Sequence, residues 1–142
     1  MSSNPIIVEQ IYEAPVEKVW KAITDRDAMQ KWYFDFQEFR AEVGFEFRFW
    51  GGPADDRQYL HICEITEVLP TQKLSYTWRY DGYPGITIVT FELSPEGDNA
   101  LVRLSHSGLE SFPKENADFA PENFVEGWNW IIGKSLKEFL EQ

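Results

Sequence analysis

Cysteine and basic residues are both scarce in this chain of 142 residues. Cys63 is the only cysteine, so an intrachain disulfide is excluded, as is typical of proteins in a reducing compartment. Thirteen Lys and Arg residues stand against 24 Asp and Glu residues, which gives a net charge of −11. Nucleic acids and anionic membrane surfaces are bound by basic patches that displace counterions. The composition therefore argues against both as partners.

Long apolar runs are missing as well, since no segment approaches the ~20 residues that span a bilayer. The first residues lack the charged start and apolar stretch of a secretory signal. Internal repeats and low-complexity tracts are also absent. The length is that of one ordinary domain. We therefore expect a single cytoplasmic domain over residues 1–142.

Aromatic residues, in contrast, are abundant: 11 Phe, six Tyr and six Trp make up 16% of the chain. This content predicts a core or a cavity lined with rings. Many of the rings lie in segments where apolar and polar residues alternate, such as Phe45, Phe47 and Phe49. A period of two is typical of a half-buried antiparallel strand. We predict a sheet with strands over 6–13, 36–41, 43–49, 57–69, 74–80, 86–93 and 100–107, and with turns at 51–56, 81–85 and 94–99.

Helices are expected on both sides of this meander in the sequence. Pro15 suits the first position of a short helix over 15–24, and Thr24-Asp25 resembles the cap of a second one. Over 121–141, apolar residues recur at intervals of three and four, which predicts one long amphipathic helix. Such a helix buries its apolar stripe against the concave face of the sheet. The predicted fold class is α+β: a curved antiparallel sheet wrapped round a long C-terminal helix, with two short helices after the first strand.

The order of these elements and several short motifs resemble a known family. The motifs are Ala14-Pro15, Val19-Trp20, Thr24-Asp25, Trp32, Ile62-x-Glu64-Ile65, Leu74-x-Tyr76-Thr77-Trp78, His106-Ser107-Gly108-Leu109 and Gly127-Trp128. In their order and spacing the chain is similar to the START-like superfamily, which has the helix-grip fold. Within that superfamily it resembles the C-terminal domain of the activator of the Hsp90 ATPase. The resemblance implies a hydrophobic ligand held between the sheet and the long helix.

A ligand in that position would meet aromatic side chains from two strands and the helix. The candidate ligand-binding residues are Phe47, Phe49, Glu64, Tyr76, Trp78, Trp128 and Ile132. Buried Tyr and Trp side chains carry donors that need partners, which favours a cavity containing water or polar groups of a ligand. The orientation of Glu64 stays open. It shares its parity with apolar neighbours, so it points either into the cavity, where burial would raise its pKa, or to the solvated outer face.

Three residues could carry other chemistry, namely His61, Cys63 and His106. A zinc site could be drawn through them, but there is no Cys-x-x-Cys or His-x-x-x-His motif, and a buried thiol beside a surface or capping histidine is the simpler interpretation. A nucleophilic Cys63 would need a base and an electropositive setting, which this acidic chain does not suggest. We expect no metal, no cofactor and no assembled catalytic site.

Three functions remain open at this point. The first is binding of a small apolar or aromatic ligand. The second is an enzyme of the polyketide cyclase or hydrolase type, which the superfamily also contains, with Glu64, His61 or a tyrosine as acid and base. The third, implied by the resemblance alone, is a co-chaperone or stress-response protein linked to Hsp90. Because no nucleophile, base and oxyanion donor are grouped in the sequence, ligand binding is favoured.

The segment 109–120 is predicted to be an irregular acidic loop at the rim of the fold. Glu110, Glu115 and Asp118 lie in it, against Lys114 as the basic residue. A rim with this charge should disfavour anionic ligands and favour neutral or cationic aromatic ones.

Overall fold

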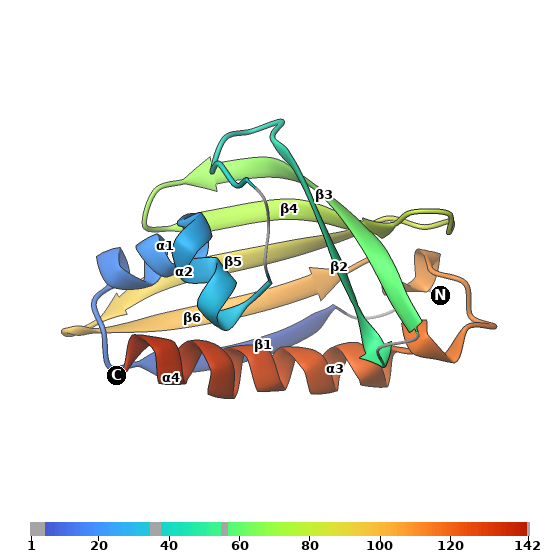
Figure 1. The fold of residues 1–142 in the computed structure, drawn as a ribbon. Coiled ribbons are helices and arrows are strands. Elements are labelled where there is room, and N and C mark those ends of the chain that lie inside the picture. The colour runs from blue at the N-terminus through green and yellow to red at the C-terminus, as the bar shows by residue number, and fades with distance from the viewer. Residues whose placement is uncertain (1–4, 35–37, 55–56, 142) are drawn as a thin grey trace.

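The computed structural model describes residues 5–34, 38–54 and 57–141. Over these residues, six strands form one antiparallel sheet with the order β1-β6-β5-β4-β3-β2 (Figure 1). The strands are β1 Ile6–Tyr12, β2 Glu46–Ala54, β3 Arg57–Leu69, β4 Lys73–Tyr80, β5 Thr87–Glu96 and β6 Asn99–Ser107. Consecutive strands from β2 to β6 are neighbours, which is the predicted meander, and β1 lies at the edge beside β6.

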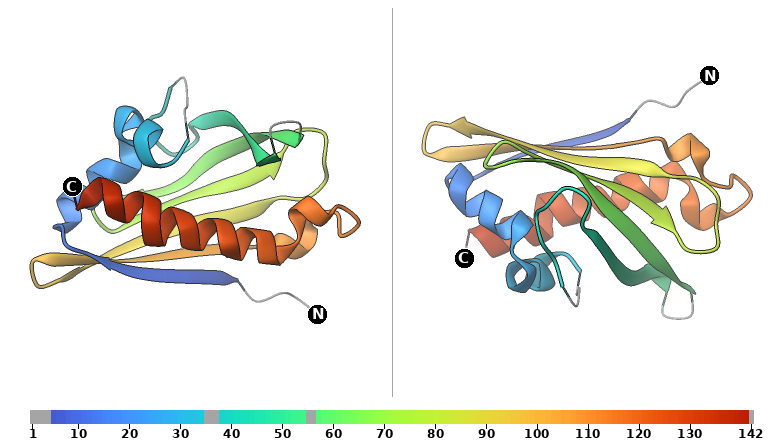
Figure 2. Two further views of the ribbon diagram at one scale, coloured as in Figure 1. Left: turned by 60° about the horizontal axis from the view of Figure 1, so that its bottom comes forward. Right: turned by 90° about the horizontal axis from the view of Figure 1, so that it is seen from above.

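The C-terminal helix crosses the face of the sheet (Figure 2). It consists of α3 (Pro121–Trp130), a π-helical segment (Ile131–Ser135) and α4 (Leu136–Leu140). Trp128, Ile132 and Leu136 are buried in the core between helix and sheet. The predicted helix and its buried stripe are therefore confirmed. The π-helical segment was not indicated by the periodicity, and the Tyr12 hydroxyl of β1 donates a hydrogen bond to the Ile132 carbonyl within it at 2.6 Å.

Two short helices, α1 (Val16–Thr24) and α2 (Arg26–Trp32), lie at one end of the C-terminal helix (Figure 1). As predicted, Asp25 caps α2, because its Oδ2 accepts a hydrogen bond from the Ala28 amide at 3.0 Å. Trp32 joins the two helices by donating its indole N–H to the Ala22 carbonyl at 2.9 Å. Ser135 then ties α2 to the C-terminal helix, since its hydroxyl donates to the Trp32 carbonyl at 2.6 Å.

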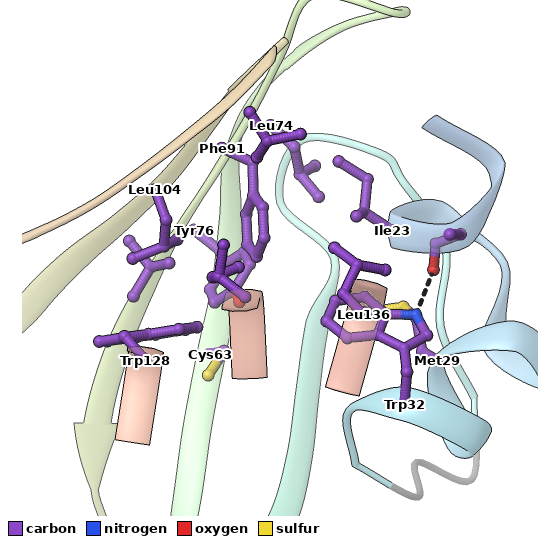
Figure 3. Packing of buried hydrophobic residues seen from close by; sticks show 14 of the residues in the cluster. Ile23, Met29, Trp32, Cys63, Leu74, Tyr76, Phe91, Leu104, Trp128 and Leu136 are labelled. Atoms are coloured by element: carbon purple, nitrogen blue, oxygen red, sulfur yellow. Dashed lines mark hydrogen bonds between the residues drawn. The ribbon is translucent and has the colours of Figure 1, made fainter. Parts of the chain in front are cut away.

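The core fills the space between the sheet and these helices. In Figure 3, Leu74, Tyr76 and Phe91 of the sheet point into the same interior as Leu136 of the C-terminal helix and Trp32 of α2. The fold class is thus confirmed as α+β, with a curved antiparallel sheet gripping one long helix and two short helices after the first strand.

The prediction of seven strands was wrong in the segment before β2. Residues 38–41 form no strand, while residues 36 and 37 of the predicted strand lie outside the described residues. The strand predicted from residue 43 begins at Glu46 instead. Its first residues form a turn in which Gly44 has a φ of 92° and the Phe45 amide bonds to the Glu42 carbonyl. Val43 is consequently exposed, although it matches the alternation.

Two predicted turns are also shorter than expected. Residues 51–54 belong to β2 rather than to a turn, with a register irregularity opposite β3, and residues 55–56 lie outside the described residues. The turn predicted at 94–99 is a tight hairpin between Glu96 and Asn99, whose pairing closes the ladder between β5 and β6. Gly97 allows this hairpin because its φ is 64°, a conformation that favours glycine.

Candidate ligand-binding site

Six of the predicted ligand-binding residues come together in the interior, and we call them the aromatic wall. They are Phe47 and Phe49 of β2, Tyr76 and Trp78 of β4, and Trp128 and Ile132 of the C-terminal helix, and all six are buried. The ring centroids of Phe49 and Trp78 are 5.7 Å apart, and those of Trp78 and Trp128 are also 5.7 Å apart. Phe47 meets Tyr76 edge-on at 5.1 Å. The wall therefore joins the sheet to the helix through direct ring contacts.

Glu64, the seventh candidate, does not belong to the wall. Its side chain is exposed, and its backbone amide donates a hydrogen bond to the Thr77 hydroxyl at 3.0 Å. The inward positions of β3 are instead His61, Cys63 and Ile65, which are all buried. Of the two orientations left open for Glu64, the structure shows the outward one, so Glu64 does not line the interior. Both faces of β3 carry apolar residues, so alternation alone did not identify the inner face.

His106 of β6 lies at the centre of a buried hydrogen-bond chain. Its Nδ1 accepts the indole N–H of Trp128 at 3.0 Å, so the ring proton must be on Nε2, which lies 2.7 Å from the Thr87 hydroxyl. Thr87 in turn donates to the Trp78 carbonyl at 2.8 Å. Burial lowers the pKa of His106 to about 3, so the ring is neutral at physiological pH. Both ring nitrogens therefore have partners, and the chain of hydrogen bonds links β6 to β5, β4 and the C-terminal helix.

His61 packs beside the wall from β3. Its ring stacks on Phe49 with centroids 4.4 Å apart, and its Nδ1 lies 3.0 Å from the Tyr59 carbonyl, which requires the proton on Nδ1. Burial lowers the pKa of His61 to about 4. Cys63, two residues on, is fully buried, and burial raises the pKa of its thiol. That shift is opposite to what a nucleophile or a metal-binding thiolate needs. Within the described residues, no three His, Cys, Asp or Glu side chains are grouped so that they could hold a metal ion.

The polar atoms of the buried aromatic side chains satisfy one another. The Trp78 indole N–H donates to the Tyr80 hydroxyl at 3.0 Å, and the hydroxyls of Tyr33 and Tyr76 lie 2.7 Å apart. Over the part of the chain that the structure describes, every buried side-chain nitrogen and oxygen has a hydrogen-bond partner. These donors therefore need neither water nor a ligand as partners, so they do not by themselves favour a cavity.

Tyr33 and Phe34, which the sequence analysis did not single out, cover the wall beside β2. Phe34 stacks on Phe49 with centroids 4.2 Å apart, and Tyr33 lies 6.1 Å from Trp128. Both residues directly follow α2, and Tyr33 has no helical backbone conformation. Their signal in the sequence is the run Trp32-Tyr33-Phe34 just beyond the helix end, but the direction of these rings depends on where the chain leaves α2.

A surface hollow of about 810 Å³ lies along the edge strand β2. Its lining combines apolar and charged side chains from β2, α2 and neighbouring segments: Arg26, Glu38, Phe45, Glu46, Phe47, Arg48, Phe49, Trp50 and Leu60. The charges balance, since two arginines face two glutamates, and Arg48 and Glu46 form an ion pair at 2.8 Å. Phe47 and Phe49 are the wall residues that belong to this lining, and both of their side chains are buried.

The sequence profile of one protein family matches residues 13–141, which is nearly the whole chain, and its description is activator of Hsp90 ATPase homolog 1-like protein. The chain belongs to this family. The six wall residues and His106 all lie within the part of the chain that matches it. No curated protein matches the chain. In the described residues of this family member, no helix is both long and apolar enough to cross a membrane.

Solved structures show the same fold in several proteins. Protein CV1439 from Chromobacterium violaceum is 27% identical, with a TM-score of 0.82 and 98% of each chain covered. Protein MLL2253 from Mesorhizobium loti is also 27% identical, with a TM-score of 0.78 and 97% of each chain covered. CalU16 from Micromonospora echinospora is 26% identical, with a TM-score of 0.73, and the match covers 96% of this chain and 75% of that one. These family-type relatives support the architecture over its full length.

Proposed function

We propose that this member of the family binds a small, neutral apolar or aromatic ligand between its sheet and its C-terminal helix. The observation that carries the proposal is the cluster of wall rings at the edge of the sheet, where Phe34 covers Phe49 beside a surface hollow whose lining includes Phe47 and Phe49. Aromatic rings with few charges are the usual lining of small-molecule sites. The resemblance to the START-like superfamily points to the same place for a ligand.

The ligand would take the position of Tyr33 and Phe34. In the structure Phe34 stacks on Phe49 and Tyr33 lies 6.1 Å from Trp128, so the two rings fill space that a planar ligand of similar size would occupy. They follow the end of α2 rather than lying in a strand or the long helix, so they can move at lower cost than wall residues held by the sheet ladder. A ligand hydroxyl or carbonyl could then replace the Tyr33 hydroxyl as the partner of Tyr76.

Catalysis is not part of the proposal. Cys63 has a raised thiol pKa, the two histidines are neutral and hydrogen-bonded, and Glu64 lies on the outer face. The link to Hsp90 stays a prediction from the family resemblance.

The test uses N-phenyl-1-naphthylamine, a neutral aromatic dye whose fluorescence rises when it leaves water. We expect a saturable rise with the native protein, and tighter binding by Phe34→Ala, because that substitution removes a ring that competes with the dye. Trp130→Ala is the control, because it also removes an aromatic side chain but at an exposed position of the C-terminal helix. The absence of saturable binding by both native protein and Phe34→Ala would overturn the proposal.

A further inference from the structure

A second hollow lies at the opposite end of the fold from α2. There the start of β3 meets the turn between β4 and β5 and the loop between β6 and α3 (Figure 1). The hollow measures about 640 Å³ and is lined by Tyr59, Tyr83, Pro84, Pro113, Glu115, Asn116, Ala117 and Asp118. Among the described residues, its lining contains two aromatic rings and two carboxylates but no Lys or Arg. This combination differs from that of the hollow at β2, where charges of both signs are present.

The aromatic part of this lining is rigid. The rings of Tyr59 and Tyr83 have centroids 5.5 Å apart and are inclined at 67°, so they present two differently oriented surfaces. Both rings rest on Phe119, at 5.1 Å and 5.2 Å. Phe119 is itself buried, which fixes the base of the arrangement. The face of an aromatic ring attracts a cation that lies within about 6 Å of its centroid.

The acidic part is held in place by hydrogen bonds. The Tyr59 hydroxyl donates to Oδ2 of Asp118 at 2.6 Å, which ties β3 to the loop and raises the pKa of Tyr59. The Asp118 amide donates to Oδ1 of Asn116 at 3.0 Å, and Asn123 of α3 donates to the Ala117 carbonyl at 2.8 Å. The loop therefore has a defined conformation before any ligand binds, so binding does not have to supply the cost of ordering it.

This hollow is separate from the aromatic wall. Phe119 stacks on Tyr80 with centroids 4.6 Å apart and an angle of 15°, and both side chains are buried. Phe112 packs against both rings, with centroids 5.2 Å from Tyr80 and 5.5 Å from Phe119. The described linings of the two hollows share no residue, so a molecule in this one would not contact Phe47 or Phe49.

We propose that the hollow is a binding site for a small organic cation with an alkylammonium group. The cationic head would lie over the rings of Tyr59 and Tyr83, with Glu115 supplying opposite charge. Ring faces suit a weakly hydrated ammonium, whereas Ca²⁺ or Mg²⁺ need a shell of oxygen ligands. No group of three acidic or histidine side chains that could form such a shell occurs in the described residues. The inference does not depend on ligand binding at the wall.

The first experiment compares choline with 3,3-dimethyl-1-butanol, which has nearly the same shape without the charge. Binding to the full-length protein is followed by calorimetry and by the NMR signals of the Tyr59 and Tyr83 rings. We expect choline to bind and the neutral alcohol to bind at least fivefold more weakly, with choline binding weakened by salt. Equal affinities for the two compounds, or no binding of choline, would overturn the proposal.

The second experiment uses paired variants. Tyr83→Leu should weaken choline binding about two- to fivefold while Tyr83→Phe keeps it, because the ring face carries the attraction. Tyr83 is partly exposed, so neither variant should disturb folding. Glu115→Gln should weaken choline binding more than Glu110→Gln, which removes the same charge from the same loop but outside the lining of this hollow. Equal effects of the two Glu→Gln variants, or of the two Tyr83 variants, would show that the site is not there.

Discussion

Trp128 of the C-terminal helix and His106 of β6 are joined by a buried hydrogen bond of 3.0 Å from the indole N–H to Nδ1. This single contact fixes three things. It determines which nitrogen of His106 is protonated, it sets the rotation of the Trp128 ring against Trp78, and it links helix to sheet at the middle of the core. The bond persists only while His106 is neutral, because protonation of Nδ1 would turn an acceptor into a donor.

The first prediction concerns pH. Unfolded histidine takes up a proton near pH 6.5, whereas burial lowers the pKa of His106 to about 3 and that of His61 to about 4. Between these values the unfolded state binds more protons, so the folded state loses stability as pH falls. The free energy of unfolding should drop by about 1 kcal/mol per pH unit for each histidine from pH 6.5 toward pH 4. Urea unfolding at pH 7, 6 and 5 measures this slope.

The controls are His61→Gln and His106→Gln. Each variant is expected to be less stable than the native protein at pH 7, yet to lose less stability between pH 7 and pH 5 because one titrating group is gone. An unchanged slope in both variants would mean that carboxylates, and not the two histidines, cause the acid sensitivity.

The second prediction separates the ring of Trp128 from its N–H group. Trp128→Ala removes a large buried side chain and should cost about 3–5 kcal/mol of stability. Trp128→Phe keeps a ring but leaves Nδ1 of His106 without its donor, so it should cost about 1–3 kcal/mol. Trp130→Ala, on the exposed side of the helix, should cost less than either. Chemical unfolding ranks the three, and equal stabilities for Trp128→Ala and Trp130→Ala would contradict the buried position of Trp128.

Periodicity predicted the sheet and the long helix because burial on one face leaves a regular pattern. Phe47 and Phe49, like Tyr76 and Trp78, alternate with polar residues, and in each pair the alternating residues point into the core. Trp128, Ile132 and Leu136 recur at helical spacing for the same reason. Which of these side chains are buried depends only on the repeat of the strand or helix and on the presence of a second layer. The sequence alone is therefore enough to predict their burial.

The sequence did not predict strand bounds or side-chain orientation where these depend on contacts between distant segments. The turn at Gly44 interrupts an alternation that continues in the sequence, so Val43 matches the pattern but is exposed. Glu64 lies in a strand with apolar residues on both faces, and the inner face is determined by pairing with Phe47 and its neighbours rather than by β3 itself. Tyr33 and Phe34 join the wall through the direction in which the chain leaves α2, which no short-range pattern describes.

The third prediction concerns the π-helical segment. The Tyr12 hydroxyl donates to the Ile132 carbonyl at 2.6 Å and is fully buried, and burial raises its pKa far above the usual value for tyrosine. Tyr12→Phe leaves that carbonyl without this donor and should cost about 1–3 kcal/mol. Tyr83→Phe, at a partly exposed tyrosine, should be nearly neutral and is the matched control. If both variants unfold at the same urea concentration, the bond does not stabilise the segment.

The last prediction concerns the charge of the ligand at the aromatic wall. The chain carries a net charge of −11, while the hollow at β2 has two arginines and two glutamates and so has little net charge of its own. Discrimination should therefore come from the field of the whole protein, which repels anions and is screened by salt. In titrations with matched aromatic compounds, the neutral one should bind more tightly than its carboxylate, and the difference should shrink at high salt. Tighter binding of the carboxylate would point instead to direct pairing with Arg26 or Arg48. In that case Arg48→Gln should weaken carboxylate binding more than Arg103→Gln, which removes the same charge on the outer face of β6 away from the hollow.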